Sequence, residues 1–236
     1  MKAIVLAGGK GARLAPYTKI LPKPLVPIGD MPILEVIIHQ LKRSGVDEIT
    51  LTVGHLANLL QAFFDNGSRY GVKIHYSFED KPLGTVGPLS LIPRPEQAFF
   101  VLNGDVLTTL DLKKLYADHL ASGATVTIAT HRRQVKIDLG VIEFDSNQQV
   151  TAYTEKPVLD YAVSMGIYVF EPHVIDSIPP KQFLDFPNLV QVLLARGERV
   201  QVFPFDGYYQ DLGNPQDYEQ AVQDFEKMRV EFLGEE

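Results

Sequence analysis

With 236 residues and a net charge of −7, the chain is long enough for one large α/β domain and lacks the basic excess that nucleic-acid-binding proteins use. Its 45% hydrophobic and 22% charged content is that of a soluble globular protein, and no apolar stretch is long enough for a signal peptide or a membrane span. The absence of cysteine excludes disulfides, thiolate nucleophiles and cysteine metal ligands. We therefore expect a cytoplasmic protein that binds neither nucleic acid nor membrane.

The first predicted strand, residues 2–6, runs into a glycine loop. The loop glycines are Gly8, Gly9 and Gly11. Backbone N–H groups in such a loop can hold phosphate oxygens, and Arg13 and the proline-flanked Lys23 would add positive charge. Leu14 stands where a dinucleotide-binding fingerprint needs a small residue, and no Walker sequence follows. On the loop alone, a phosphate site and a surface turn with solvated cations are equal alternatives.

Apolar runs then alternate with amphipathic helices. The predicted helices cover residues 32–44, 56–66 and 111–122, with Asp111 as the N-cap of the third and Leu120 on its apolar face. The predicted strands are 47–53, 72–77 and 98–102. Such alternation is typical of a mostly parallel sheet with helices on both faces.

The second half of the chain is richer in strands. They are predicted at 124–130, 140–144, 150–154, 164–170 and 199–204. Because few helices separate them, we expect antiparallel pairing there, before a last helix that begins at Asn214-Pro215 and includes Val222 and Phe232 in its packed face. No repeat or linker divides residues 1–236, so we expect one domain, with a nucleotide half (1–123) and a half for a second substrate (124–236).

Several polar residues stand where a ligand could lie. Asp105 follows a buried strand and a glycine, and ligands gather at the carboxyl ends of strands in α/β sheets. With phosphates nearby, Asp105 could bind Mg²⁺, and Asp211 has a similar setting. Glu155 and Lys156 occupy a short turn, and Gly140 would let a ligand approach the neighbouring strand. Taken alone, Asp105 could be a turn or N-cap residue, and Asp211 and the Glu155-Lys156 pair are more typical of ordinary turns.

In order, the motifs resemble those of the sugar nucleotidyltransferases. They are LAGGKGARLAPYTKILPKPLVPI, FEDKPLGTVGPL, VLNGDV, TEKP and YYQDLGNP. The resemblance implies a three-layer α/β/α, Rossmann-like nucleotide-binding domain with a mixed, mainly parallel central sheet. It also implies transfer of a nucleotidyl group from an NTP to a sugar 1-phosphate, which gives an NDP-sugar and pyrophosphate.

The resemblance also implies roles for individual residues. Arg13 would bind the leaving pyrophosphate, Lys23 would neutralise the α-phosphate, and Asp105 and Asp211 would hold Mg²⁺. The nucleotide-binding residues would be Leu6, Ala7, Gly8, Gly9, Gly11, Glu79, Gly84 and Thr85. The sugar-phosphate-binding residues would be Asn103, Gly140, Glu155, Lys156 and Ser164.

The PLGTVG turn and Asn103 most resemble guanylyltransferases that make GDP-mannose or GDP-heptose, although uridylyl- and thymidylyltransferases share much of the pattern. Ser164-Met165-Gly166 departs from the Asn-Ala-Gly common in relatives. Many relatives continue into a C-terminal β-helix, so we expect a catalytic domain alone, with self-association left open. A non-catalytic NDP-sugar-binding regulator is the alternative from another class, and the lack of an Asp-x-Asp motif after strand 98–102 disfavours a glycosyltransferase.

Overall fold

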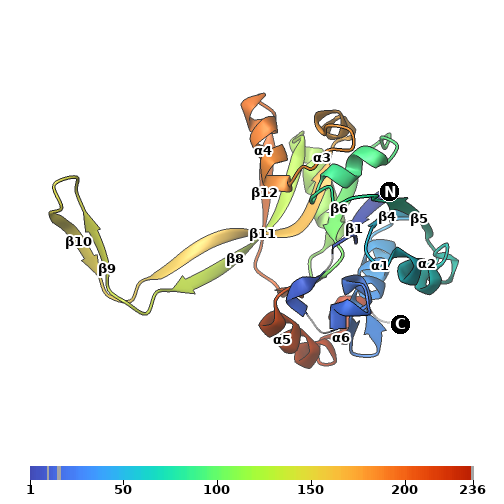
Figure 1. The fold of residues 1–236 in the computed structure, drawn as a ribbon, viewed down its shortest axis with the longest axis horizontal. Coiled ribbons are helices and arrows are strands. Elements are labelled where there is room, and N and C mark those ends of the chain that lie inside the picture. Colours follow the sequence, from blue (N-terminus) through green and yellow to red (C-terminus); the bar gives the residue numbers. More distant parts are fainter. Residues whose placement is uncertain (10, 15–16, 235–236) are drawn as a thin grey trace.

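Seven strands form the central sheet of the computed structural model, which describes residues 1–9, 11–14 and 17–234 (Figure 1). The strands are β1 (Lys2–Leu6), β4 (Glu48–Val53), β5 (Lys73–Phe78), β6 (Phe99–Asn103), β8 (Val126–Lys136), β11 (Val158–Phe170) and β12 (Val200–Phe205). Their order is β12-β8-β11-β6-β1-β4-β5, and β11 alone of these seven runs antiparallel to its neighbours. The predicted mixed, mainly parallel sheet is therefore confirmed.

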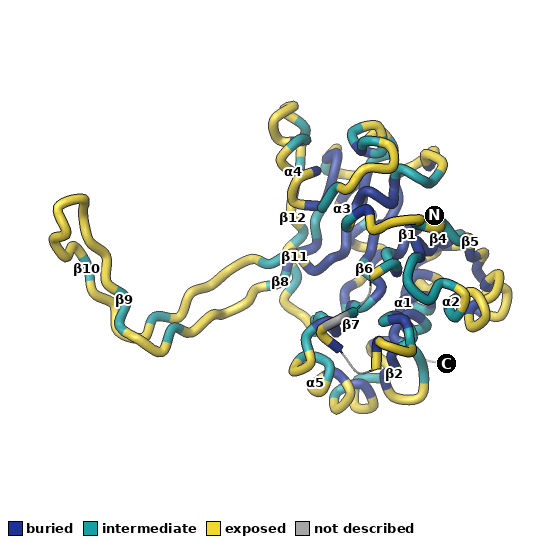
Figure 2. The backbone as a smooth tube through the Cα atoms, viewed as in Figure 1, coloured by how far each residue is buried: buried dark blue, intermediate teal, exposed yellow. Residues whose placement is uncertain are grey.

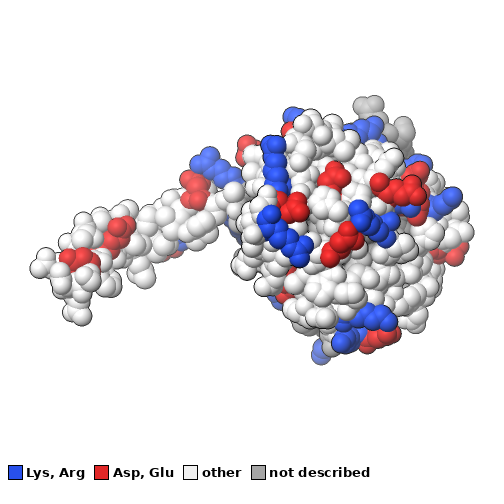
Figure 3. Space-filling model, turned by 90° about the horizontal axis from the view of Figure 1, so that it is seen from above, with Lys and Arg blue, Asp and Glu red and all other residues white. Residues whose placement is uncertain are grey.

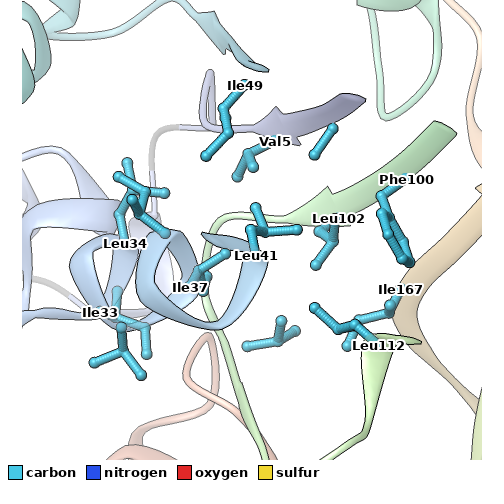
Figure 4. Packing of buried hydrophobic residues seen from close by; sticks show 14 of the residues in the cluster. Val5, Ile33, Leu34, Ile37, Leu41, Ile49, Phe100, Leu102, Leu112 and Ile167 are labelled. Carbon is cyan, nitrogen blue, oxygen red and sulfur yellow. The ribbon is translucent and has the colours of Figure 1, made fainter. Parts of the chain in front are cut away.

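Helices cover both faces of this sheet, because neighbouring residues of a buried strand point to opposite sides. One core contains Val5 and the other contains Ile4. Packed into the first core are α1 (Ile33–Arg43), α2 (Ala57–Phe64), α3 (Leu112–Ser122), α5 (Pro215–Phe225) and α6 (Arg229–Leu233). The second core holds α4 (Phe186–Ala195) and the 3₁₀ turns η5 (Gly87–Leu91) and η6 (Pro172–Ser177). In Figure 4, Ile37 and Leu41 of α1 face Val5 and Leu102 of the sheet.

Shorter elements complete the body of the fold. They are the pair β2 (Pro27–Ile28) and β3 (Met31–Pro32), the pair β7 (Val106–Thr108) and β13 (Tyr209–Asp211), and the 3₁₀ turns η1 (Ala12–Leu14), η2 (Tyr17–Lys19), η3 (Lys23–Leu25) and η4 (Ser68–Tyr70). Within the described ranges, none of the helices has the length and apolar character needed to cross a membrane.

A two-stranded ribbon leaves the body of the molecule. β8 and β11 stay paired from His131 to Lys136 and from Val158 to Val163, and the chain between them forms β9 (Val141–Phe144) and β10 (Val150–Thr154). We call residues 131–163 the arm. Most of the arm is exposed and stands apart from the layers (Figures 1 and 2).

Both predicted helix caps are confirmed. The Asp111 carboxylate accepts from the Lys114 N–H (3.1 Å) at the start of α3, and the Asn214 side chain accepts from the Gln216 N–H (3.1 Å) at the start of α5.

One residue in each of two predicted helix faces was placed wrongly. Leu120 is exposed in α3, where the buried position belongs to the preceding residue, His119. The last predicted helix is interrupted after Phe225, so Phe232 reaches the core from α6 while Val222 of α5 is exposed.

His119 predicts acid sensitivity of the fold. Its ring is fully buried, with Nδ1 2.8 Å from the Thr127 hydroxyl and Nε2 3.2 Å from a Glu171 oxygen. Burial lowers the pKa of His119 below its usual 6.5, although the Glu171 carboxylate opposes the shift. The unfolded chain therefore binds an extra proton below about pH 6.5, and the free energy of unfolding should fall as the pH falls through that value. Urea titrations from pH 7.5 to 5.5 should show a shallower fall for His119→Asn; equal slopes would contradict this origin.

Candidate active site

The loops that follow β1, β4 and β6 meet at the carboxyl edge of the sheet. The Ala7 N–H donates to the Thr52 carbonyl (2.9 Å), and the Gly104 N–H donates to the Leu6 carbonyl (3.0 Å). Gly54 lies so close to the glycine loop that a Cβ on it would be 3.2 Å from the Gly8 carbonyl oxygen. The end of β1 and the glycine loop are thus held by backbone hydrogen bonds on both sides, as a pre-formed anion site requires.

Glu79, directly after β5, lies against this loop. A Cβ on Gly8 would collide with its carboxylate, and the other carboxylate oxygen accepts from the Leu83 N–H (3.1 Å). Burial raises the pKa of Glu79, and the Leu83 hydrogen bond opposes that rise. The structure therefore brings together Gly8 and Glu79, two of the residues that the resemblance assigns to the nucleotide.

Gly84 and Thr85 make a different set of contacts. Gly84 has a φ of +80° and packs on the chain before α4. The Thr85 N–H donates to the Asp185 carboxylate (3.0 Å), and the Thr85 hydroxyl accepts from the Phe186 N–H (2.7 Å). The Thr85 hydroxyl thus accepts a hydrogen bond from a backbone N–H in the first turn of α4, which has no partner within the helix.

A cluster of opposite charges centres on Lys23. The Lys23 ammonium forms an ion pair with Asp105 and lies 4.0 Å from an oxygen of Asp211. Its side chain is only 12% exposed, and burial lowers the pKa of Lys23 to about 8; the Asp211 carboxylate opposes this shift and the Arg13 guanidinium adds to it. At pH 7 the ammonium still carries its proton.

Strand pairing explains why two aspartates 106 positions apart in the sequence meet. β13 pairs with β7 so that Asp211 lies opposite Val106, and the Leu212 N–H donates to the Asp105 carbonyl (3.0 Å). The turn that follows lies under the two cations: a Cβ on Gly213 would be 2.8 Å from Arg13 Nη2 and 2.9 Å from Asp211 Oδ1. One cluster of charged side chains therefore contains Arg13, Lys23, Asp105 and Asp211.

Gly213 and Gly54 are contributors that the sequence reasoning missed. The available signal for Gly213 was the turn sequence Asp-Leu-Gly-Asn-Pro, in which the Gly213 N–H donates to the Asp211 carboxylate (2.8 Å). Gly54 follows β4 in the same way that the glycine loop follows β1, so its position at a strand end was the corresponding signal.

The candidate sugar-phosphate residues fall into two groups. Asn103 ends β6 and packs against Gly166, whose φ is +70°, and the Ser164 hydroxyl nearby donates to the Tyr168 hydroxyl (3.1 Å). Gly140, Glu155 and Lys156 lie on the arm instead. There the Tyr153 hydroxyl covers Gly140 and donates to the Glu155 carboxylate (3.1 Å), in the ribbon that Figure 1 shows standing apart from the body.

The Gly213→Ala variant should change the geometry of the site without changing the stability of the fold. The new methyl group would displace the ends of three side chains, those of Lys23, Arg13 and Asp211, which costs little stability but moves both cations. We expect kcat to fall about tenfold or more, since a misplaced charge stabilises the transition state poorly, with Tm nearly unchanged. Gly197→Ala is the control, because a Cβ there meets no atom within 4 Å but carries the strain of φ +74°. It should lower Tm and leave kcat unchanged; a Gly213→Ala variant with normal kcat would contradict the geometry.

Residues 2–228 match the nucleotidyl transferase family. The chain belongs to this family. It is 37% identical to a UTP–glucose-1-phosphate uridylyltransferase of Synechocystis sp., over 94% of the chain and 62% of that relative. It is also 34% identical to a mannose-1-phosphate guanyltransferase of Schizosaccharomyces pombe, over 92% of the chain and 62% of that relative. The chain thus spans less than two thirds of the length of these relatives.

A structural comparison supports the same fold. A Bacillus anthracis protein named as a glucose-1-phosphate thymidylyltransferase superimposes with a TM-score of 0.77, over 94% of each chain, at 24% identity. The family that the motifs indicated is therefore confirmed.

Proposed function

We propose that this nucleotidyl transferase joins GTP to mannose 1-phosphate or heptose 1-phosphate, giving the GDP-sugar and pyrophosphate. An oxygen of the sugar phosphate attacks the α-phosphorus, the bond from that phosphorus to the bridging oxygen breaks, and pyrophosphate leaves. The observation that carries the proposal is the convergence of Arg13, Lys23, Asp105 and Asp211 beside a glycine loop in a chain of this family.

This chemistry needs positioning and charge more than it needs a base. The sugar phosphate is already a nucleophile, and the difficulty is to bring two anions together in line. In the proposed arrangement, N–H groups of Gly8, Gly9 and Gly11 hold the triphosphate, Arg13 binds the departing pyrophosphate, and Lys23 neutralises the α-phosphate. Its burial makes Lys23 a strong electrostatic partner there, since less water screens its charge.

The two aspartates fit a divalent metal. Mg²⁺ in nucleotide sites takes one or two carboxylates together with phosphate oxygens and water, and Asp105 and Asp211 converge on one cation, the Lys23 ammonium. We assign Asp105 and Asp211 as the residues that would hold Mg²⁺. The bound ion would neutralise phosphate charge and orient both substrates.

Glu79 supports guanine as the base. Guanine presents N1–H and a 2-amino group side by side, whereas uracil and thymine present a single N–H; an ionised carboxylate accepts both guanine donors. Glu79→Gln replaces half of that acceptor with a donor. We expect the ratio of kcat/KM for GTP over UTP to fall about tenfold or more in this variant. An unchanged ratio would remove Glu79 from base recognition.

The remaining residues are proposed for the sugar phosphate. Asn103 and Ser164 lie near the metal-binding edge and offer hydrogen bonds to sugar hydroxyls, while Lys156 and Glu155 would bind phosphate and hydroxyl groups. Gly140 would allow the sugar to approach the arm once the Tyr153 hydroxyl that covers it moves aside.

A matrix of four NTPs against a panel of sugar 1-phosphates, read by pyrophosphate release, tests the proposal. GTP with mannose or heptose 1-phosphate should give the highest kcat/KM. The second candidate pair is UTP with glucose 1-phosphate, because the Synechocystis relative is named for these substrates. A higher kcat/KM for that pair would overturn the guanylyl assignment. Tight NDP-sugar binding without turnover for any pair would favour the regulatory alternative.

A further inference from the structure

The arm is a regular two-stranded ribbon that stands apart from the body of its own chain. Its hydrogen bonds run within the ribbon, as between Arg132 and Asp160 (3.1 Å) and from the Ile137 N–H to the Pro157 carbonyl (3.0 Å). Two-stranded ribbons are marginally stable in water without further packing. Figures 1 and 2 show β9 and β10 projecting into solvent on both sides.

Apolar side chains make up most of one face of the arm, which also carries Arg133 near its root. The register pairs Val135 with Leu159 in β8 and β11, and at the tip it pairs Ile142 with Tyr153. Phe144 and Val150 follow on the same face of the tip, and Phe144 is 67% exposed. The opposite face of the ribbon carries Arg132, Gln134 and Asp160, joined by hydrogen bonds. A row of exposed apolar side chains backed by a polar face indicates a surface that packs on protein. Figure 3 shows an arm surface that is mostly uncoloured, with Asp or Glu groups along it and Lys or Arg groups near its root.

The root of the arm fixes its direction. The His131 ring lies 3.0 Å from the Phe205 carbonyl oxygen and packs on Tyr209, and Arg133 lies 3.9 Å from a carboxylate oxygen of Asp217. These contacts hold the root of the arm against the body, while β9, β10 and the turn between β10 and β11, which carries Glu155 and Lys156, stand apart from it (Figure 1).

The surface beside the glycine loop also exposes apolar side chains. Tyr17 and Ile20 are exposed there, Ile20 to 74%. This turn is tied to the loop by a hydrogen bond from the Thr18 hydroxyl to the Gly11 carbonyl (2.8 Å). It lies beside the site that lacks Glu155 and Lys156 of its own chain, so an apolar arm packed on it would reach that site.

We propose that two copies of this chain exchange arms, so that the arm of each copy lies against the glycine-loop side of the other and brings Glu155 and Lys156 to its sugar-phosphate site. This inference rests on the proposed function, which assigns those two residues to the sugar phosphate. Because each copy carries one arm and one site, a two-fold axis satisfies both and closes the assembly.

Complementation between inactive variants tests the exchange. Lys23→Ala inactivates the body but keeps a normal arm, and the double variant Glu155→Ala/Lys156→Ala keeps a normal body. Unfolding and refolding an equal mixture should restore about a quarter of wild-type activity, because half of random dimers are mixed and each has one complete site of two. If the wild type is active and the refolded mixture of variants regains no activity, the exchange is overturned. That result would favour an arm that closes on its own body.

The mass of the chain in solution gives a second measurement that does not depend on activity. Sedimentation should show a particle of twice 26.3 kDa, and Ile142→Asp/Phe144→Asp should convert it to a folded monomer by circular dichroism. Leu194→Asp is the control, since Leu194 is equally apolar and 56% exposed on the body, and it should leave the dimer intact. An active wild-type monomer would refute the inference. If the Ile142→Asp/Phe144→Asp variant loses the dimer but the wild type releases no pyrophosphate with any substrate pair, the docked arm is supported. The proposed function is then contradicted instead.

Discussion

Lys23→Ala is expected to lower kcat about 10²–10³-fold, the usual cost of losing one pre-placed group that stabilises transition-state charge, while the protein still folds. The Lys23 ammonium is buried between Asp105 and Asp211 and beside the Arg13 guanidinium, so its loss removes the positive charge at the centre of the cluster. Removal leaves two carboxylates facing the incoming α-phosphate, and that repulsion adds to the loss. Steady-state pyrophosphate release and thermal unfolding of the same preparation measure both effects.

The control for this variant is Lys113→Ala, which removes an exposed lysine of α3 at the surface. It should leave kcat within twofold of wild type, since single surface charges contribute little. Lys23→Arg keeps the charge but replaces a compact ammonium with a broad planar group, so partial activity is expected. Near-normal turnover by Lys23→Ala would remove Lys23 from the catalytic role.

Most of the fold could be predicted from the hydrophobic pattern of the sequence. Strand β4 was predicted at 47–53 and is found at Glu48–Val53, because Ile49, Leu51 and Val53 alternate with polar residues in the period-two pattern of a strand. Helix faces were less certain. α3 has only weak amphipathic character, so Leu120 and His119 could exchange roles without violating the pattern, and the hydrogen bonds of His119 to Thr127 and Glu171 settled the choice.

The site was predictable as a set of residues and not as a geometry. Motif order placed Lys23, Asp105 and Asp211 in one reaction, but their proximity depends on the pairing of β7 with β13, a long-range contact that no local pattern encodes. The arm shows the same limit. Strands were expected at 140–144 and 150–154, but only the three-dimensional register reveals that they pair with each other in the arm, outside the central sheet.

Removal of divalent metal with EDTA is expected to reduce pyrophosphate release to background, and excess Mg²⁺ should restore it. Two substrates that each carry several negative charges must meet beside Asp105 and Asp211, which add two more. Lys23 and Arg13 alone cannot balance that charge, and each is committed to one phosphate in the proposed arrangement. Full activity in EDTA would show that Asp105 and Asp211 act only as partners of Lys23.

Neutral variants locate the metal effect at the two aspartates. Asp105→Asn and Asp211→Asn keep the size of each side chain but lose one anionic ligand, so each should raise the Mg²⁺ concentration for half-maximal activity and lower kcat. Asp211→Asn should also remove a charge that raises the pKa of Lys23. Asp176→Asn, at an exposed ion pair with Arg94, is the matched control and should leave the Mg²⁺ titration unchanged. If the Asp105 and Asp211 variants titrate like this control, the metal lies elsewhere and the two carboxylates serve to hold Lys23 in the site.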